Sequence, residues 1–376
     1  MKKTVLLIRN VAPEKYGGGE SYQLMLAGQL KKHGFCPVVL SSSRKLRAEA
    51  KKAGYATEEC PFLARQNWSG WRNLLYPVYL AQISRLSKWY AEIFRKYQPV
   101  AINVQSRDDW LAATPVAKKL GIRVLWTDHM DFRSWVMQNV DHPIKNPIAK
   151  RILKTAKLAD KVIFISDFER KYFGSIQRAQ ALQNLAVIKN GAIDTAADYA
   201  SVKADKNEIL YLGRLEDYKG VKELILAFMQ IGNFFPKVRL KIFGTGPYED
   251  ELKKLAGDRV EFCGFTNEPL AKMAESQIFV LASYREGLSL SLLDAAMLGR
   301  TIIASDVDGN PEIVVDQKTG LLVPAQNVDA LADALRKVLS DAKLAQDLAK
   351  NARRHYEENF DFEQIFEKQM LELYEK

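Results

Sequence analysis

Acidic side chains and glycine turns occur together in the stretch SYREGLSLSLLDAAMLGRTIIASDVDGNPEIV, residues 283–314. Glu286 precedes a glycine, Asp294 follows eight residues later within a helical pattern, and Glu312 comes after the next apolar run. Carboxylates accept hydrogen bonds from hydroxyl groups, so all three acids could serve a nucleotide-sugar pocket. The alternative is an acidic residue that only favours a helix N-terminus.

A helix start is predicted directly after Glu286. Gly287 permits a tight turn, and the amides of Leu288, Ser289 and Leu290 come next. The first amides of a helix have no partner within it, and they favour anions. We therefore expect these backbone groups to bind phosphate oxygens or sugar hydroxyls.

The stretch GRLEDYKG, residues 213–220, places Arg214 and Lys219 between a predicted strand and the next predicted helix. Two cations beside free helix-end amides suit a diphosphate, because side-chain charge and helix dipole favour the same anion. The alternative is a pair of solvated basic residues, which is common near strand ends.

A second glycine-rich turn, YGGGE, follows the first predicted strand and precedes a helical pattern. Gly17, Gly18 and Gly19 carry no side chain, so the backbone can approach a ligand closely. The GxGxxG spacing of dinucleotide-binding folds is absent, which disfavours an NAD-dependent dehydrogenase. A loop without any ligand is the alternative.

The elements that position these residues follow from an alternation of short apolar runs and helical patterns. We predict strands at residues 4–8, 37–40, 101–104, 123–126, 161–165, 209–212, 240–243, 260–263, 278–281 and 301–304. Apolar strands separated by helices are typical of parallel sheets covered on both faces. The fold class is therefore α/β, with two Rossmann-like, doubly wound parallel-sheet domains that face across a cleft, where we expect the ligand.

Domain boundaries follow from length and composition. A chain of 376 residues exceeds what one hydrophobic core supports, and residues 191–207 are small and polar, as in a linker. We assign an N-terminal domain to residues 1–190 and a C-terminal domain to residues 208–358. The pattern of residues 359–376 predicts one more helix. This helix could pack on either domain, and we assign it to the N-terminal domain.

Composition and charge narrow the class of protein. Three scattered cysteines support no disulfide framework, and no apolar run reaches the length of a membrane span, so we expect a cytoplasmic protein. The first 185 residues carry 31 Lys/Arg and 14 Asp/Glu, whereas the remainder carries 24 and 31. A basic half indicates an anionic partner, or merely a solvated surface. Nucleic acid is disfavoured because no binding motif accompanies the charge.

Seven short motifs together resemble the retaining GT-B glycosyltransferases of family 4, over nearly the whole chain. They are GGGE at 17–20, TDHMD at 127–131, IKNGAID at 188–194, GRLEDYKG at 213–220, FGTGP at 243–247, FCGF at 262–265 and REGLSLSLLDAAMLG at 285–299. In the family, the last motif carries two glutamates in the pattern E-x7-E. Here Asp294 stands in the second position, one methylene shorter.

The resemblance implies a role for each matching residue. Arg214 and Lys219 would hold the donor diphosphate, Glu286 the donor sugar and Asp294 the ribose hydroxyls, while His129 would lie near the reacting carbon. The implied donor-binding set comprises Gly18, Gly19, Gly246, Phe265, Gly287, Leu288, Ser289, Leu290 and Asp294.

No metal ion or cofactor is expected besides the nucleoside-diphosphate sugar, which is a substrate. Asp306 and Asp308 have the spacing of a metal-binding DxD motif, but they fall in a turn for which the family has an equivalent loop and no catalytic metal. The leaving diphosphate would be neutralised by cationic side chains and helix N-termini instead.

The implied activity is transfer of a sugar from a nucleoside diphosphate, with UDP as the expected nucleotide, to an acceptor hydroxyl with retained configuration. Residues 66–98 mix tryptophans and tyrosines with Arg and Lys, which suits an anionic membrane surface or a core helix with a solvated face. We expect a lipid-linked or anionic glycan acceptor in cell-envelope polysaccharide, lipopolysaccharide or glycolipid synthesis, at the inner face of the plasma membrane. A nucleotide-sugar epimerase and a non-enzymatic nucleotide-sugar binding module are the competing interpretations.

Overall fold

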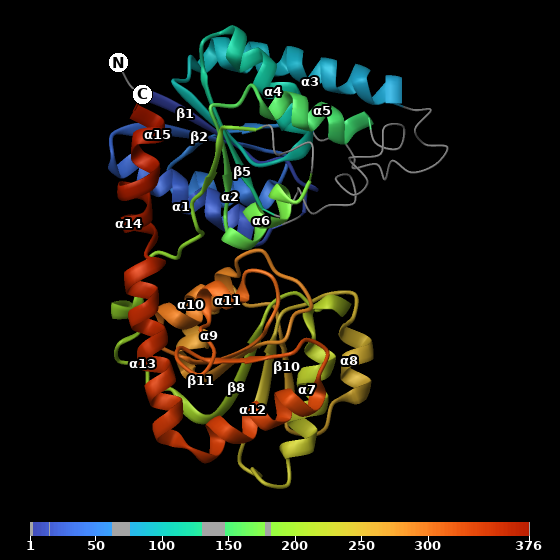
Figure 1. The fold of residues 1–376 in the computed structure, drawn as a ribbon, viewed down its shortest axis with the longest axis vertical. Coiled ribbons are helices and arrows are strands. Elements are labelled where there is room, and N and C mark those ends of the chain that lie inside the picture. Colours follow the sequence, from blue (N-terminus) through green and yellow to red (C-terminus); the bar gives the residue numbers. More distant parts are fainter. Residues whose placement is uncertain (1–2, 15, 62–75, 130–146, 177–181, 376) are drawn as a thin grey trace. The chain divides into compact units, whose positions relative to one another are not determined.

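The computed structural model describes residues 3–14, 16–61, 76–129, 147–176 and 182–375, which form two compact units. Unit 1 comprises Met1–Lys189 together with Phe366–Lys376, and unit 2 comprises Asn190–Ile365 (Figure 1). Each unit has its own parallel sheet and its own core, and the two are described separately below.

The sheet of unit 1 has the strand order β3-β2-β1-β4-β5-β6-β7, and all its strands are parallel. The strands are β1 (Lys3–Ile8), β2 (Phe35–Ser41), β3 (Ala56–Glu59), β4 (Ala101–Val104), β5 (Arg123–Asp128), β6 (Lys161–Phe164) and β7 (Leu185–Val187). The order reverses between β1 and β4, because the chain adds strands outward in one direction up to β3 and then in the other.

Helices cover both faces of this sheet. They are α1 (Gly18–Lys32), α2 (Arg44–Lys52), α3 (Tyr76–Tyr97), α4 (Arg107–Lys119), α5 (Pro147–Ala156) and α6 (Asp167–Gly174). Leu6 and Ile8 of β1 pack into the core formed with α3, α4 and α5, whereas Val39 of β2 contacts the layer of α1 and α2. Burial on both faces explains why the inner strands are continuous apolar runs.

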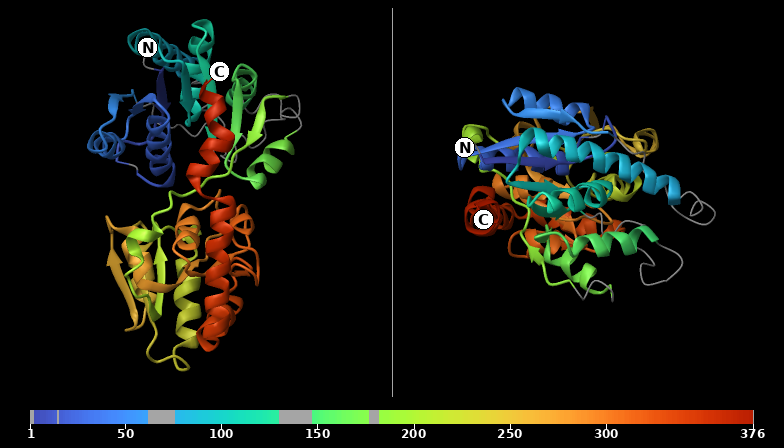
Figure 2. Two further views of the ribbon diagram at one scale, coloured as in Figure 1. Left: turned by 90° about the vertical axis from the view of Figure 1, so that its left-hand side faces the viewer. Right: turned by 90° about the horizontal axis from the view of Figure 1, so that it is seen from above.

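The end of the chain returns to unit 1. After α14 (Phe362–Ile365), one π-helical segment, η6 (Phe366–Met370), leads into α15 (Leu371–Glu375), which lies along unit 1 (Figure 2). Phe366, Met370 and Tyr374 are buried there, and Nη1 of Arg123 donates to the Leu373 carbonyl at 2.9 Å.

The sheet of unit 2 has the order β10-β9-β8-β11-β12-β13, again all parallel. Its strands are β8 (Asp205–Leu212), β9 (Arg239–Phe243), β10 (Val260–Gly264), β11 (Ser276–Leu281), β12 (Thr301–Ser305) and β13 (Leu321–Val323). The reversal of strand order falls between β8 and β11.

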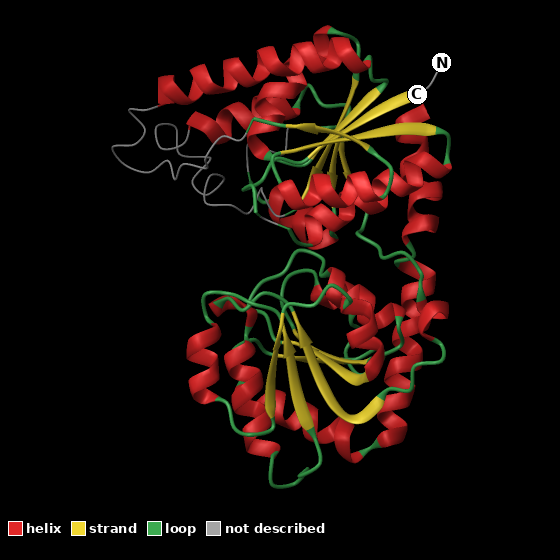
Figure 3. Ribbon diagram, turned by 180° about the vertical axis from the view of Figure 1, so that it is seen from behind, coloured by secondary structure: helices red, strands yellow, loops and turns green. Residues whose placement is uncertain are grey.

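Two helical layers enclose the sheet of unit 2 (Figure 3). One contains α7 (Val221–Ile231), α8 (Glu249–Leu255) and α12 (Val328–Ser340), and the other contains α9 (Pro269–Glu275), α10 (Leu290–Met297) and α13 (Ala342–Asn359). Short helical turns occur at η4 (Ala196–Tyr199), η5 (Asp217–Lys219) and α11 (Asn310–Ile313).

The two doubly wound parallel sheets confirm the predicted fold class, and every predicted strand is present with small changes at its ends. The strands that the sequence did not predict are β3, β7 and β13, which all lie at sheet edges. An edge strand is covered less completely than an inner one, and β3 accordingly reads ATEE and is partly exposed. The other two, β7 and β13, are apolar, reading LAV and LLV, but they are only three residues long and so give no clear period.

The segment predicted as a linker, residues 191–207, belongs to unit 2, and its last residues already form the start of β8. Gly191 lies against the backbone of Phe360, where a Cβ would collide, and the Ala192 N–H donates to the Phe360 carbonyl at 3.1 Å. Asp194 pairs with Arg353 of α13 at 2.5 Å. The small polar residues of this segment serve close packing within unit 2, whereas the sequence predicted a linker between the domains.

Candidate active site

The topology of unit 2 brings two predicted site residues together. In an open parallel sheet, ligands bind outside the carboxyl ends of the strands where the strand order reverses. Here those strands are β8 and β11, which pair directly. Lys219 lies in the loop after β8 and Glu286 in the loop after β11.

Lys219 and Glu286 form an ion pair, with Nζ and Oε1 2.7 Å apart and only 16% and 11% of the side chains exposed. Their loops are joined by the backbone, since the Tyr284 N–H donates to the Tyr218 carbonyl at 2.8 Å. Gly220, at φ 67°, allows this approach, because a Cβ there would collide with the Ala282 carbonyl.

Asp308 orients the second of these loops. Its Oδ2 accepts the Glu286 N–H at 2.9 Å, and its own backbone is left-handed at φ 52°. The following Gly309 packs on the carbonyl of Gly287, where a Cβ would collide. Within the described part of the chain, no three His, Cys, Asp or Glu side chains gather into a possible metal site.

The predicted helix start lies one residue later than expected. Ser289 is the N-cap of α10, and its hydroxyl accepts the Leu292 N–H at 3.4 Å. Leu290 and Ser291 are therefore the first helical residues, while the amide of Leu288 precedes the helix. The free amides of the helix start are those of Leu290 and Ser291.

Asp294 lies in α10 and is partly buried. Among the residues that the structure describes, no hydrogen bond or ion pair of its carboxylate is found. Burial raises the pKa of Asp294 to about 7. A carboxyl group without a partner at such a position is typical of sites that bind ligands. The third acid, Glu312, lies in the short helix α11.

Arg214 does not contact the ion pair. Its guanidinium pairs with Glu216 and donates from Nη2 to the Tyr218 hydroxyl at 2.8 Å, and 54% of its side chain is exposed. A cation that the sequence did not single out, Arg285, lies over the Tyr218 ring at 4.6 Å from the centroid. The site thus carries Arg214, Lys219 and Arg285 around one tyrosine.

Two further predicted donor-binding residues lie in neighbouring loops. Gly246 packs on the carbonyl of Leu215, where a Cβ would collide, so close packing of the backbone already explains this glycine. Phe265 follows the edge strand β10, and 59% of it is exposed. Neither makes a described contact with Glu286.

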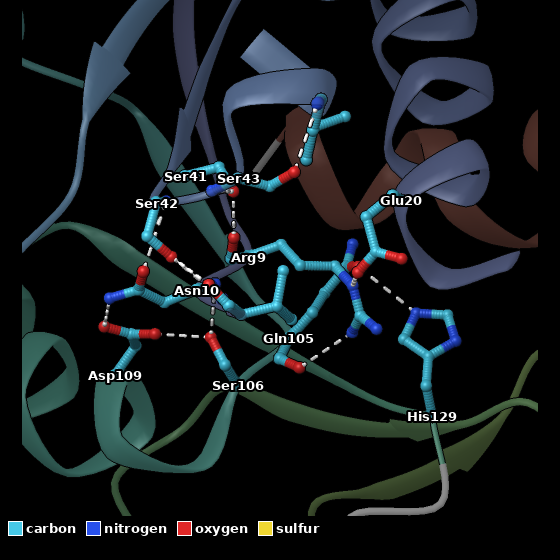
Figure 4. Close-up of polar contacts among 12 residues, drawn as sticks. Arg9, Asn10, Glu20, Ser41, Ser42, Ser43, Gln105, Ser106, Asp109 and His129 are labelled. Atoms are coloured by element: carbon cyan, nitrogen blue, oxygen red, sulfur yellow. Dashed lines mark hydrogen bonds and ion pairs between the residues drawn. The ribbon is translucent and has the colours of Figure 1, made fainter. Parts of the chain in front are cut away.

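The second group of predicted residues lies at the corresponding reversal in unit 1, between β1 and β4. Arg9, directly after β1, donates from Nε to Oε1 of the buried Glu20 at 2.7 Å and from Nη1 to the Gln105 carbonyl at 3.3 Å (Figure 4). A Cβ on Gly19 would collide with the guanidinium of Arg9. Gly18 begins α1, whose first amides have no partner inside the helix.

His129 follows β5 and points toward this group (Figure 4). Its Nε2 lies 3.2 Å from Oε1 of Gln105, and its ring meets the Tyr22 ring edge-on at 4.9 Å between centroids. Burial, with a smaller contribution from the charge of Arg9, places the pKa of His129 well below its usual value. The imidazole is therefore neutral at pH 7.

A buried polar network supports the loop after β1. Asp109 accepts from the Tyr90 hydroxyl at 2.6 Å and also bonds the Ser106 hydroxyl, which in turn accepts the Asn10 N–H at 2.9 Å. Burial raises the pKa of Asp109 to about 6. The network holds the residues next to Arg9 in place.

Sequence reasoning missed Arg9, Glu20, Gln105, Arg285 and Asp308 as parts of these groups. Arg9 and Gln105 do carry a recognisable signal, because each is the first polar residue after a buried strand whose end lies at a reversal of strand order. That signal becomes usable only when the strand order is known.

The expected membrane segment is described only in part, since Trp68, Trp71 and Arg72 lie outside the described residues. The described portion, α3, buries one face in the core of unit 1 and exposes basic side chains on the other, at Arg85, Lys88, Arg95 and Lys96. Of the helices that the structure describes, none has the length and apolar character needed to cross a membrane.

Two family profiles match consecutive parts of the chain. The profile of Glycosyltransferase Family 4 matches residues 16–196, and that of Glycosyl transferases group 1 matches residues 195–355. The chain is 29% identical over 227 residues to alpha-D-kanosaminyltransferase of Streptomyces kanamyceticus, which covers 56% of this chain and 59% of that protein.

A second relative matches over nearly the full length. The GDP-mannose-dependent alpha-(1-6)-phosphatidylinositol monomannoside mannosyltransferase of Mycolicibacterium smegmatis is 27% identical over 377 residues, covering 91% of this chain and 90% of the relative. Among solved structures, Anabaena HepE in complex with UDP and glucose superposes with a TM-score of 0.79 at 18% identity, covering 100% of both chains. The two parallel-sheet units thus have the GT-B architecture.

Proposed function

Since the chain is a glycosyltransferase of the group 1, family 4 kind, we propose that it transfers a sugar from a nucleoside diphosphate, with UDP as the nucleotide, to an acceptor hydroxyl with retained anomeric configuration. The proposed acceptor is a lipid-linked or anionic glycan of the cell envelope. Complexes of a structural neighbour with UDP and glucose support the choice of nucleotide.

The observation that carries the proposal is the ion pair of Lys219 and Glu286 at the reversal between β8 and β11. Lys219 offers a positive charge to the diphosphate, and the first amides of α10 add hydrogen-bond donors in the same loop. Glu286 offers a carboxylate to the hydroxyls of the sugar. Both groups are partly withdrawn from water, where charge interactions are stronger.

The reaction breaks the bond between the anomeric carbon and the oxygen of the β-phosphate, and it forms a bond from the acceptor oxygen to the same face of that carbon. The proton of the acceptor hydroxyl passes to the departing phosphate. Lys219, with Arg214 and Arg285 in the neighbouring positions, would stabilise the negative charge that develops on the diphosphate. Gly18, Gly19 and His129 of unit 1 are proposed to take part in the same reaction.

Glu286→Gln tests the role of the carboxylate, because glutamine keeps the size of the side chain and removes its charge. We expect turnover to fall by roughly a hundredfold or more, as for other lost transition-state contacts. Glu275→Gln, in the partly exposed ion pair of Lys272 and Glu275, is the matched control and should leave turnover unchanged. Wild-type turnover in both Glu286→Gln and Lys219→Met would exclude the assignment.

The donor and the absence of a metal requirement are tested together. Thermal-shift screening of UDP-, GDP- and ADP-sugars should show the largest stabilisation with a UDP-sugar, because binding to the folded state raises Tm.

Activity should survive a chelator, since no metal enters the proposed site. Loss of activity that Mg²⁺ restores would refute the proposal that the reaction needs no metal. Formation of an epimeric sugar nucleotide instead of a glycosylated acceptor would identify an epimerase.

The proposed acceptor also predicts association with an anionic surface. The exposed basic side chains of α3 could contact acidic lipid headgroups at the inner face of the plasma membrane. Flotation with liposomes should recover the protein with vesicles containing phosphatidylglycerol and not with phosphatidylcholine alone. No recovery with either vesicle would remove the membrane claim and leave the transferase proposal untouched.

A further inference from the structure

A chain of buried polar side chains runs through unit 1 from α15 to His129. Nδ2 of Asn103 donates to the Tyr374 hydroxyl at 2.9 Å, and Oδ1 of Asn103 accepts from Nε2 of Gln105 at 3.1 Å. The Thr127 hydroxyl lies beside the same amide, 3.1 Å from Nδ2 and 3.3 Å from Oδ1 of Asn103. Oε1 of Gln105 then faces Nε2 of His129 at 3.2 Å. Asn103 and Gln105 are fully buried, and Tyr374 is 2% exposed.

The direction of donation along these hydrogen bonds decides which nitrogen of the His129 imidazole carries the proton. A side-chain amide has one end that donates and one that accepts, and the amide of Gln105 uses its donor end on Asn103. Only an acceptor remains for His129, so its Nε2 donates and its Nδ1 keeps a lone pair.

Packing links the same segment to His129 by a second route. Sδ of Met370 lies 3.9 Å from the Tyr22 hydroxyl, and the Tyr22 ring meets the His129 ring edge-on. The last turns of the chain therefore support both the hydrogen bond and the ring orientation of the histidine.

We propose that Tyr374, Asn103 and Gln105 are positioning residues that hold His129 in the tautomer protonated at Nε2, so that Nδ1 accepts a hydrogen bond from a substrate hydroxyl. The proposal rests on the proposed function, in which His129 lies beside the transferred sugar. It adds the C-terminal segment to the machinery of the reaction and specifies an acceptor at a defined atom.

The tautomer can be observed without any activity. NMR of the full chain labelled with ¹⁵N-histidine separates protonated from unprotonated imidazole nitrogens, and His129→Asn identifies the His129 signals. We expect a proton on Nε2 in the wild type. A proton on Nδ1 would mean that the amides of Asn103 and Gln105 are turned over, and it would overturn the proposal even if the enzyme is a glycosyltransferase.

Tyr374→Phe removes only the tyrosine hydroxyl, which lies at the α15 end of this series of hydrogen bonds. Asn103 then keeps only the Thr127 hydroxyl, which can donate as well as accept and so fits either orientation of the Asn103 amide. Because the amides of Asn103 and Gln105 can then turn over, we expect the Nδ1-protonated form of His129 to appear and kcat to fall several-fold. Tyr356→Phe is the matched control, since it removes another buried tyrosine hydroxyl that donates to the Ala192 carbonyl at 2.8 Å in unit 2. It should lower Tm without changing kcat or the His129 spectrum; equal effects of both variants on kcat would reduce Tyr374 to a structural residue.

Substitutions of His129 itself test which atom is used. Asparagine places an acceptor near the position of Nδ1, whereas glutamine reaches the position of Nε2. We expect kcat/KM of His129→Asn to exceed that of His129→Gln by roughly tenfold, the worth of one buried hydrogen bond. The reverse order would contradict the proposal, and equal, wild-type values would instead exclude His129 from the proposed function.

Discussion

Asp294 is a residue whose burial lowers the stability of the folded protein once its carboxyl group ionises. Burial raises its pKa to about 7, whereas an aspartate in the unfolded chain titrates near 4. The folded state therefore binds the proton more tightly, so the stabilising contribution is full below about pH 4 and is lost as the pH rises toward 7. At pH 8 the site carries a charge that nothing in the described protein neutralises.

Asp294→Asn should consequently raise Tm, and the gain should grow between pH 5 and pH 8, because the amide cannot ionise. Scanning calorimetry at the two pH values measures this directly. If Asp294 binds the ribose, the same variant weakens nucleotide binding by roughly tenfold or more, since hydrogen bonds to charged groups are worth about 1.5–3 kcal/mol. A gain in Tm independent of pH would refute the raised pKa.

Asp294→Glu tests the departure from the family pattern. The longer side chain restores the E-x7-E spacing and should reach the ribose directly, so we expect tighter nucleotide binding in calorimetric titration. Unchanged or weaker binding would mean that α10 approaches the nucleotide closely enough for aspartate.

At the scale of elements, the loops at the carboxyl edge of unit 2 depend on glycines that let backbones touch. Gly220, Gly244 and Gly309 each lie against a carbonyl group of another loop, where a Cβ would collide. These contacts tie the loops after β8, β9, β11 and β12 into one rigid group. The position of Glu286 therefore depends on close backbone contacts made by glycines in other loops.

Gly309→Ala should disturb this group, because its methyl would force the Gly287 carbonyl to move. We expect a loss of about 1–3 kcal/mol in stability, as for other overpacked sites, and weaker donor binding as Glu286 shifts. Gly257→Ala is the control: its Cβ would meet nothing within 4 Å, so Tm and binding should stay near wild type. Equal effects of both substitutions, followed by thermal unfolding and titration, would contradict the packing argument.

At the scale of the whole molecule, unit 1 is formed by two separate segments of the chain, residues 3–189 and the last residues from Phe366 onward. Phe366, Met370 and Tyr374 bury their side chains in unit 1, far in sequence from the strands they cover. The integrity of the His129 group is thus tied to the end of the chain.

Deletion of Phe366–Lys376 should selectively destabilise unit 1. The deletion removes three buried side chains, each of which contributes about 1.5–3 kcal/mol to stability through its burial. Amide hydrogen exchange should therefore accelerate in α1, β2 and β4 and not in β8 or β11. Deletion of only the last two residues, which leaves Tyr374 in place, is the control. Uniform acceleration over both units would show that they unfold as one.

The sequence alone was sufficient to predict the repeated alternation of strands and helices, because inner strands that are covered on both faces must be continuous apolar runs. It also selected Lys219 and Glu286 by residue type and by their places after strands. It did not show that Lys219 and Glu286, 67 positions apart, form an ion pair, or that Arg214 pairs with Glu216. Nor did it show that Arg9 and Tyr374 bond the residues that support His129. Those contacts depend on strand order and on where the chain end packs, which are set by the burial of surfaces from distant segments rather than by any local pattern.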